Sequence, residues 1–419
     1  MLTKFRNTWQ EYPSKFWVVV VVTFIDVIGG TLIFPFFALY ITQHFHVGMT
    51  QAGLLLGTFS IASLVGGILG GAITDKFGRR RMVLFGLVFS AVSGLSMGLV
   101  DNLPAFFALA IVVGLLSDMA GPARQAMIAD ILPEEKRAEG FGILRVVANL
   151  SWIIGPTIGG LVAVYSFFLL FVLDAIMSLI TAAIVYRLLP ETRPAETEAQ
   201  AKQSLARTFI DYRLVLKDYT YIGFLIVTML MTLVYGQLYS TLSVYLRDVH
   251  GIVAQGYGFL LSMNAGIVVL TQITLTRKTK HLAPMLMMAV GCGFYLIGFS
   301  MYGLVSAYAL FALAMVFITI GEMIVVPLGQ TLAARFAPAD MRGRYMAFYG
   351  MTFTVPETIG PTAAGLIMDN GDPRLVWYIG GILCAVAIAG FYALHLKSRS
   401  RLALTATAAA IEPSGTAGS

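Results

Sequence analysis

The chain has 419 residues, of which 58% are hydrophobic and 12% are charged, and its mean hydropathy is +0.81. Soluble domains are about 25% charged, so this composition argues against a cytosolic enzyme, a secreted protein and a disordered chain. The formal net charge is +6. Because the basic residues lie in short segments between apolar runs, we interpret them as a membrane-topology signal and not as a nucleic-acid site.

Twelve apolar runs are long enough to cross a bilayer, since a spanning helix needs roughly 20 apolar residues. We expect an all-α membrane protein with twelve transmembrane helices in two pseudo-symmetric six-helix bundles. The expected spans are 17–43, 50–74, 82–100, 104–129, 139–164, 166–189, 220–246, 255–276, 282–305, 306–334, 343–368 and 373–396.

Lys and Arg are distributed unequally over the segments between these runs. Nearly all of the 28 basic residues fall on the side that carries both termini, whereas only Arg247 and Arg374 fall on the other side. Cytoplasmic loops of membrane proteins are rich in Lys and Arg. We therefore expect a multi-pass protein of the cell membrane, inner or plasma, with both termini in the cytoplasm.

The two halves of the chain match each other at an offset of 205 residues. Pro122 falls on Pro327 and Pro156 falls on Pro361, without a gap between them. Chains built from such repeats place their substrate and ion sites near the bilayer midplane, between the halves.

This repeat predicts four regions along the chain. The two six-helix bundles are expected at 1–189 and 219–397. Residues 190–218 are expected to form a cytoplasmic linker with an interfacial helix, and a plain solvated linker is the alternative. Residues 398–419 are rich in small side chains and are expected to form a disordered cytoplasmic tail.

Carboxylates within the expected spans are the first functional candidates. A charged side chain at the centre of a membrane helix costs about 2.5–3.5 kcal/mol, so each must face a cavity, pair with a cation or hold a proton. We expect proton coupling or substrate binding at four of them and a structural role for Asp174, whose span is expected at the periphery of its bundle. The four candidates are Glu322, Asp26, Asp118 and Glu357.

The turn after the second expected span, residues 71–81, has the sequence GAITDKFGRRR. Its glycines permit a tight turn and close helix approach, its aspartate suits the positive end of another helix, and its arginines can pair with a carboxylate. This pattern predicts a latch at the cytoplasmic face, and an ordinary basic loop is the alternative. The predicted latch consists of Gly71, Asp75, Gly78, Arg79, Arg80, Arg124 and Asp130.

Small residues and a proline form a second cluster, in the fifth expected span. Such residues let two helices touch backbone to backbone, which predicts packing or a tight seal between the halves. The cluster consists of Gly155, Pro156, Gly159 and Gly160.

Aromatic and amide side chains supply a candidate substrate surface. These residues are Phe34, Tyr40, Asn149, Trp152, Tyr235, Gln237 and Tyr239. The sequence has no GxxxxGK[ST], HExxH, CxxC or GxSxG motif. We therefore expect neither ATP-driven transport nor enzymatic catalysis, and neither a cofactor nor a metal.

The twelve spans, the repeat and the loop GAITDKFGRRR resemble the major facilitator superfamily from about residue 15 to 397. The run GPTIGG resembles a motif of its drug:proton antiporter branch. The segment GEMIVVP is similar to the one in which some multidrug members place a protonatable glutamate, which implies that role for Glu322. The second half departs from the family in lacking a full signature loop, and Arg124 lies nearer the cytoplasmic end than the antiporter pattern places its arginine.

The resemblance implies a proton-coupled secondary transporter that exports lipophilic, often cationic small molecules by alternating access. Its expected partners are the substrate, protons and the lipid bilayer, without nucleic acid, and we expect a monomer. Two alternatives stay open on the same fold, namely a proton-coupled importer of a small nutrient and a lipid or lysolipid flippase. A membrane enzyme or a receptor is disfavoured because no nucleophile–base set is visible.

Overall fold

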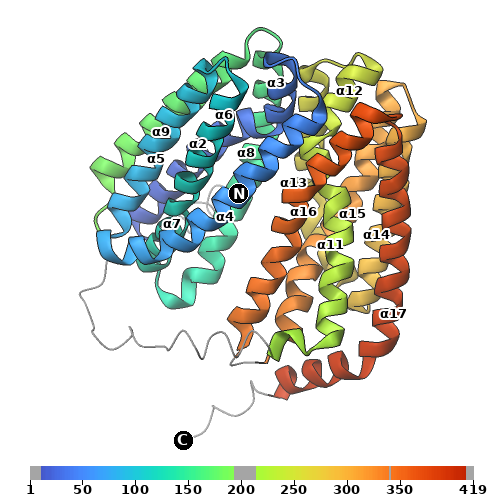
Figure 1. The fold of residues 1–419 in the computed structure, drawn as a ribbon. Coiled ribbons are helices and arrows are strands. Elements are labelled where there is room, and N and C mark those ends of the chain that lie inside the picture. Colours follow the sequence, from blue (N-terminus) through green and yellow to red (C-terminus); the bar gives the residue numbers. More distant parts are fainter. Residues whose placement is uncertain (1–10, 193–213, 339–340, 412–419) are drawn as a thin grey trace, which may run out of the picture. The chain divides into compact units, whose positions relative to one another are not determined.

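The computed structural model describes residues 11–192, 214–338 and 341–411, with the backbone alone for Gly71, Ala72, Asp75, Asp118, Ala138 and 399–411. Within these ranges the chain is almost entirely helical, and no strand occurs (Figure 1). This confirms the predicted all-α fold class.

The first six spans comprise helices α2 to α9 and three short 3₁₀ segments. Their bounds are α2 Ser14–Ile33, η1 Phe34–Phe36, α3 Phe37–His44, α4 Met49–Phe77, α5 Arg79–Leu99, α6 Leu103–Ser117, η2 Asp118–Ala120, α7 Gly121–Ile131, η3 Glu134–Lys136, α8 Arg137–Ala163 and α9 Phe167–Leu188. The first span is broken at Pro35, because proline has no N–H to donate to the preceding turn. The fourth span changes to a 3₁₀ turn just before Pro122.

The second six spans run from α11 to α17. Their bounds are α11 Tyr219–Ser240, α12 Leu242–His250, α13 Ala254–Thr279, α14 Pro284–Leu304, α15 Tyr308–Phe336, α16 Arg342–Asn370 and α17 Leu375–Ile411. Helix α17 continues through 399–411, whereas the sequence analysis expects a disordered tail from residue 398. The predicted interfacial helix falls mostly on 193–213, outside the described residues.

Eleven helical segments of the described ranges are long and apolar enough to cross a bilayer. The expected eleventh span corresponds to α16, which has 29 residues and is long enough but more polar, with Glu357 and Asp369 along it. With α16 included, the helices account for all twelve expected spans. The chain is therefore a multi-pass membrane protein.

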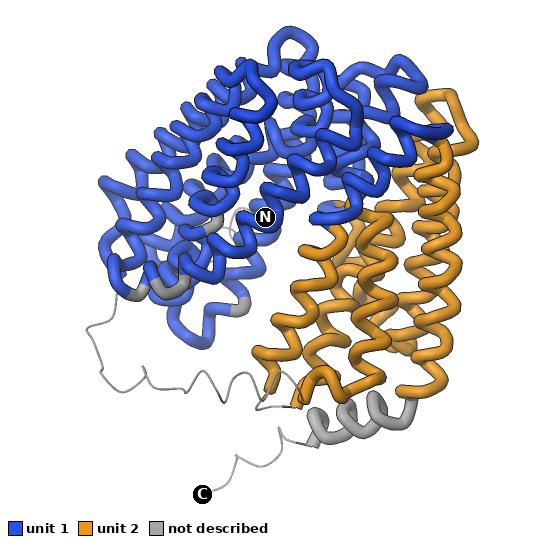
Figure 2. Tube along the Cα trace, in the orientation of Figure 1, with its two compact units in different colours: residues 1–197, 237–269, 357–373 blue, residues 198–236, 270–356, 374–419 orange. Residues whose placement is uncertain are grey.

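The chain divides into two compact units, coloured in Figure 2. Unit 1 contains α2 to α9 together with 237–269 and 357–373, and unit 2 contains 198–236, 270–356 and 374–419. Helices α11, α13 and α16 contribute residues to both units. In unit 1, α2 packs against α8 and α9, α5 packs against α9, and α4 packs against α6. In unit 2, α14 packs against α15 and α17.

The two ends of unit 1 differ in charge. At the basic end α4 is followed by α5, and Lys76, Arg79, Arg80 and Arg81 surround the junction. The opposite end is the one where α4 begins at Met49. Apolar side chains around Phe16, Met127 and Val185 form a core near the basic end.

Candidate functional site

A cavity of about 560 Å³ lies inside unit 1, among the membrane-spanning helices. Helices α2, α4, α5, α6, α7 and α9 contribute its walls. Its lining is mixed, with glycine and serine beside charged side chains. The lining residues are Asp26, Gly30, Phe59, Ser63, Gly86, Leu87, Ser90, Ser117, Ala120, Gly121, Arg124, Gln125 and Asp174.

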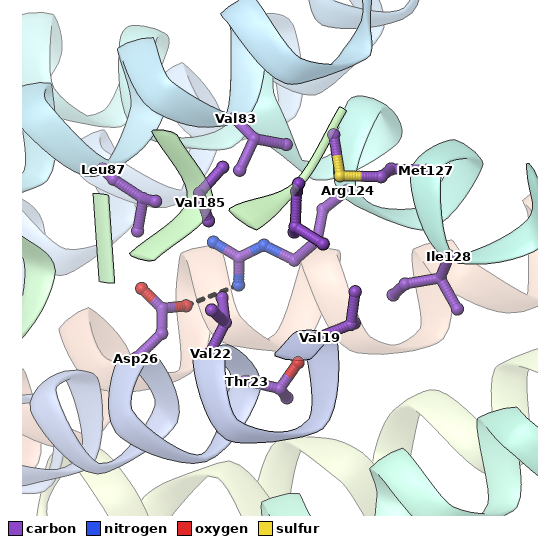
Figure 3. Close-up of a pocket in the computed structure, with 11 residues that line it drawn as sticks. Val19, Val22, Thr23, Asp26, Val83, Leu87, Arg124, Met127, Ile128 and Val185 are labelled. Atoms are coloured by element: carbon purple, nitrogen blue, oxygen red, sulfur yellow. Dashed lines mark hydrogen bonds and ion pairs between the residues drawn. The ribbon is translucent and has the colours of Figure 1, made fainter. Parts of the chain in front are cut away.

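Asp26 on α2 and Arg124 on α7 form an ion pair on the wall of this cavity. Nη1 of Arg124 donates to Oδ2 of Asp26 at 2.5 Å. The Asp26 side chain is 17% exposed and the Arg124 side chain 40% exposed. Figure 3 shows the two groups pointing toward each other among valine, leucine, isoleucine and methionine side chains. Because these apolar neighbours keep water from part of the pair, its attraction is stronger than that of an ion pair in free solution.

Asp174 on α9 is the third charged side chain on the cavity wall and is 8% exposed. Gly29 makes room for its carboxylate, and Gly94 lies beside it. A Cβ atom at Gly29 would lie 2.6 Å from Oδ1 of Asp174, and a Cβ atom at Gly94 would lie 3.5 Å from Oδ2. The sequence predicts a structural role for Asp174, but the structure places it on the same cavity as Asp26. The small residues Gly29 and Gly30, one turn after Asp26, are the sequence signal that could have indicated this approach.

The structure corrects the predicted contact of Arg124. The sequence predicts Arg124 as part of the latch near the basic end, whereas its guanidinium pairs with Asp26 inside the membrane-spanning region. The physical reason is that α7 passes beside α2, so a long side chain on α7 reaches the carboxylate. The side chains of Asp118 and Asp75, and the surroundings of Gly71, lie outside the described residues.

The remaining residues of the predicted latch meet at the basic end. Nε of Arg79 lies 2.6 Å from Oδ2 of Asp130, an ion pair that joins α5 to α7. Gly78 has φ +90°, a left-handed conformation that glycine adopts without steric cost. Arg80 donates from Nη2 to the carbonyl oxygen of Tyr186, and its guanidinium lies over the Tyr186 ring.

Glu191, which the sequence does not predict at this site, also lies at the basic end beside Arg79 and Arg80. Its carboxylate accepts hydrogen bonds from the backbone N–H of Arg79 at 2.8 Å and of Arg80 at 3.2 Å. The first N–H groups of a helix have no partner within the helix. Glu191 therefore caps α5 and attaches the segment after α9 to the turn between α4 and α5.

The glycine–proline cluster of α8 packs against α2 and α13. A Cβ atom at Gly159 would lie 2.5 Å from the carbonyl oxygen of Leu32, and one at Gly160 would lie 2.8 Å from that of Ala254. Gly155 is in close contact with Thr31. From the other side, Gly258 of α13 contacts the carbonyl oxygen of Pro156. Pro156, Gly159 and Gly160 thus lie at backbone-to-backbone contacts within unit 1, and Gly155 makes room for the Thr31 side chain.

Three of the predicted substrate residues come together in unit 1. The ring centroids of Phe34 and Trp152 lie 6.3 Å apart, those of Phe34 and Tyr239 6.2 Å apart, and those of Trp152 and Tyr239 5.4 Å apart. Phe34 is 56% exposed, and Trp152 and Tyr239 are half-buried. This aromatic triad presents an accessible apolar surface just after the break in the first span.

The other predicted substrate residues lie elsewhere. Tyr40 is buried in an aromatic cluster, stacks on His44 and donates to the carbonyl oxygen of Met97, so it serves packing at this position. Gln237 is buried and accepts from Thr241 at 2.5 Å. Asn149 is half-buried on α8, and Tyr235 stacks on Tyr295 in unit 2.

Glu322 and Glu357 stand on different helices. Glu322 lies on α15 in unit 2, half-buried, one turn before Pro327. Glu357 lies on α16 and is exposed. Neither lines the cavity that holds Asp26, Arg124 and Asp174.

At the opposite end of unit 1, α16 packs closely on α4. A Cβ atom at Gly53 would lie 2.5 Å from the carbonyl oxygen of Pro361, and one at Gly365 would lie 2.5 Å from that of Met49. Asp369 accepts hydrogen bonds from the first backbone N–H groups of α4. The repeat partners of the fifth-span cluster, Pro361 and Gly365, therefore also lie at a close helix contact.

Comparison with known proteins agrees with this architecture. The family model of the Major Facilitator Superfamily matches residues 19–357 and 304–414. The uncharacterized MFS-type transporter YttB of Bacillus subtilis is 30% identical over 382 residues, covering 90% of this chain and 94% of that protein. A Na(+), Li(+), K(+)/H(+) antiporter of Planococcus maritimus is 28% identical, covering 89% and 94%.

Matches at lower sequence identity are also to transporters. The multidrug resistance protein MdtH of Yersinia enterocolitica is 24% identical, covering 87% of this chain and 90% of that protein. The crystal structure of the nucleoside transporter NupG superposes with a TM-score of 0.77 at 14% identity, covering 91% of this chain and 99% of that one, which shows a shared fold. The chain is a transporter of the Major Facilitator Superfamily, as its match to the family model over most of its length shows.

Proposed function

We propose that this transporter exports lipophilic, often cationic small molecules in exchange for protons, by alternating access. The observation that carries the proposal is the Asp26–Arg124 ion pair on the wall of a cavity inside the membrane-spanning helices. The multidrug resistance relative and the antiporter relative support the class of function. The protein works as a monomer in the cell membrane without a cofactor, and its basic end faces the cytoplasm.

Proton binding at a carboxylate on the cavity wall gives this site a way to change state. A protonated carboxyl group does not attract the Arg124 guanidinium as an ion, so a change of protonation changes how strongly each carboxylate attracts the guanidinium. When the cavity opens to the cytoplasm the proton leaves, and the newly ionised carboxylate attracts the guanidinium. Glu322 on α15 is the second coupling candidate, since it is a half-buried carboxylate within a membrane span.

The aromatic triad of Phe34, Trp152 and Tyr239 supplies the proposed substrate surface. A cation over an aromatic face gains about 0.5–2 kcal/mol, depending on how well water is excluded. Flat apolar faces also accept compounds of varied shape, because they impose few directional contacts. This chemistry suits lipophilic cations better than sugars or peptides, which need more hydrogen-bonding groups.

The test is transport in proteoliposomes with an imposed pH gradient and a fluorescent lipophilic cation. We expect gradient-driven dye movement by the native chain, its loss in Glu322→Gln or in Asp26→Asn, and normal movement in Glu135→Gln. Glu135 is a matched control because it is an exposed carboxylate in a loop at the basic end. The absence of dye movement by the native chain under any gradient would contradict the proposal and favour a nutrient importer or a lipid flippase.

Exchange of inorganic monovalent cations for protons is a second candidate. It is favoured by the presence of two carboxylates, Asp26 and Asp174, on one cavity wall, and by the relative described as a Na(+), Li(+), K(+)/H(+) antiporter. Addition of NaCl or KCl to proteoliposomes with an acidic interior would then release protons from the lumen. A proton signal with these salts and no dye movement would select this function over the first.

A further inference from the structure

The charged groups on the cavity wall do not balance. Asp26, Asp174 and Arg124 line it, and no other Lys, Arg, His, Asp or Glu does so among the described residues. With both carboxylates ionised, these three described side chains together carry one net negative charge inside the membrane-spanning region. Because ionised groups are costly there, one proton or one monovalent cation is needed to neutralise the site.

The position of that proton follows from the partners of the two carboxylates. Asp26 already has the Arg124 guanidinium at 2.5 Å. Asp174 is more than nine-tenths buried, faces the same cavity, and has no hydrogen bond or ion pair within the described ranges. Three helices pack on α9. At the level of Asp174, α5 contributes Gly94 and Ser90, and α2 contributes Gly29 and Asp26. The cations of the third helix, α8, are Arg137 and Arg145, and neither lines the cavity.

The two carboxylates are near enough to influence each other. Gly29, against which the Asp174 carboxylate lies, is three residues after Asp26 and therefore on nearly the same face of α2. Like charges repel, so an ionised Asp26 disfavours a second negative charge on Asp174. Arg124 is 40% exposed and long, so its guanidinium has room to move along the cavity wall.

We propose that Asp174 carries the exchanged proton and that the Arg124 guanidinium pairs in turn with Asp26 and Asp174. In the state described by the structure, Arg124 pairs with Asp26 and the proton sits on Asp174. When the proton leaves Asp174, the guanidinium lies between two carboxylates, and a monovalent cation restores neutrality. This deepens the proposed function, on which it rests, because it makes the exchange of one proton for one monovalent cation electroneutral at this site.

The first test measures the proton directly, without a substrate. Infrared difference spectra of the purified full chain, recorded during a pH titration, should contain the C=O band of a protonated carboxyl group. We expect this band to be lost in Asp174→Asn and to remain in Asp26→Asn and Glu135→Gln. A band that is unchanged in Asp174→Asn, or that depends on Asp26 instead, would overturn the proposal.

The second test follows exchange, with tetraphenylphosphonium as the probe. In weakly buffered detergent solution, binding of this cation should release protons from the native chain. Asp174→Asn lacks the carboxylate that the cation neutralises, so it should bind the cation more weakly and release no protons. Glu135→Gln should release protons as the native chain does. Proton release that persists in Asp174→Asn would contradict the inference.

These two tests separate the inference from the proposed function. A native chain that binds no tetraphenylphosphonium would refute the cation exporter, whereas loss of the carboxyl band in Asp174→Asn would still support protonation of Asp174. Asparagine has nearly the size of aspartate, so it fits beside Gly29 and Gly94. If that variant does not fold, Asp174→Glu keeps a titrating group, and the proposal then requires the carboxyl band to shift in frequency.

Discussion

Asp369 holds the first turn of α4 from 320 residues away in the sequence. Its Oδ1 accepts from the backbone N–H of Met49 at 2.9 Å, and its Oδ2 accepts from that of Thr50 at 2.8 Å. The residue before this helix is Gly48, which has no side chain to cap it. A carboxylate from the end of α16 thus takes the place of a local cap, and it stabilises the helix by joining it to another.

Replacing Asp369 by alanine should loosen the start of α4. An N-cap side chain contributes about 1 kcal/mol to the stability of its helix. Loss of that free energy corresponds to about fivefold faster amide exchange at positions where breaking this contact limits the opening of the helix. We expect this increase at Met49 and Thr50, measured by hydrogen–deuterium exchange with mass spectrometry. Asp101→Asn is the control, since Asp101 is an exposed carboxylate at the same end and pairs with His44. Equal exchange in both variants would show that the cap contributes nothing.

Adding a methyl group to Gly258 should destabilise the protein, because that position contacts the carbonyl oxygen of Pro156. Gly258→Ala should melt at a lower temperature than the native chain and transport more slowly. Gly266→Ala, in the same helix but with no atom within 4 Å of its new Cβ, should melt at the same or a higher temperature. The buried Cys292 and Cys384 thiols provide the readout, through a dye that reacts with them on unfolding.

Removing the Glu191 carboxylate should weaken the start of α5. Glu191→Ala leaves the N–H groups of Arg79 and Arg80 without this acceptor, and we expect a loss of about 1 kcal/mol in unfolding free energy. Glu135→Ala, which removes an exposed carboxylate near the same end, should change stability little. Thermal unfolding of both variants measures the difference, and a larger effect of Glu135→Ala would argue against the cap.

The Asp26–Arg124 pair should show an energetic coupling in a double-mutant cycle. Because Arg124 is 40% exposed and solvent screens part of the attraction, we expect a coupling of about 1 kcal/mol between Asp26→Asn and Arg124→Gln. Thermal unfolding of the two single variants and the double variant measures it. The distant pair Asp101→Asn and Arg124→Gln should be additive, and additivity of both pairs would contradict an interaction between Asp26 and Arg124.

The sequence predicts the helices of this protein well and their internal breaks poorly. Long apolar runs identify membrane spans because the bilayer demands that length whatever the detailed packing. The 3₁₀ turns at Phe34–Phe36 and Asp118–Ala120 depend instead on how each proline is accommodated by neighbouring helices. The polar character of α16 is also visible in the sequence, where Glu357 and Asp369 interrupt the apolar run.

The candidate site is predictable only in part. A carboxylate in a membrane span is recognisable from the sequence alone, so Asp26 is identified. The pairing of Asp26 with Arg124 is not predictable in this way, because a contact between α2 and α7 depends on the rotation of both helices about their axes. Asp174 is missed for the same reason, since a residue on the sixth span faces either the bundle interior or lipid according to helix rotation. Glu191 is missed because a cap contributed from outside the helix leaves no spacing pattern.

The glycine contacts between α4 and α16, and between α8 and α13, bring backbone against backbone with little side chain between them. Side chains that interlock across a contact must change rotamer before the surfaces can separate. Where Gly53 meets Pro361 and Gly258 meets Pro156 there is no such interlocking. These surfaces can separate and meet again without a change of side-chain rotamer. The turnover rate of this transporter should therefore be governed by the few hydrogen bonds beside them. These are the bonds accepted by Asp369 and the 2.6 Å hydrogen bond from Thr157 to Ser262.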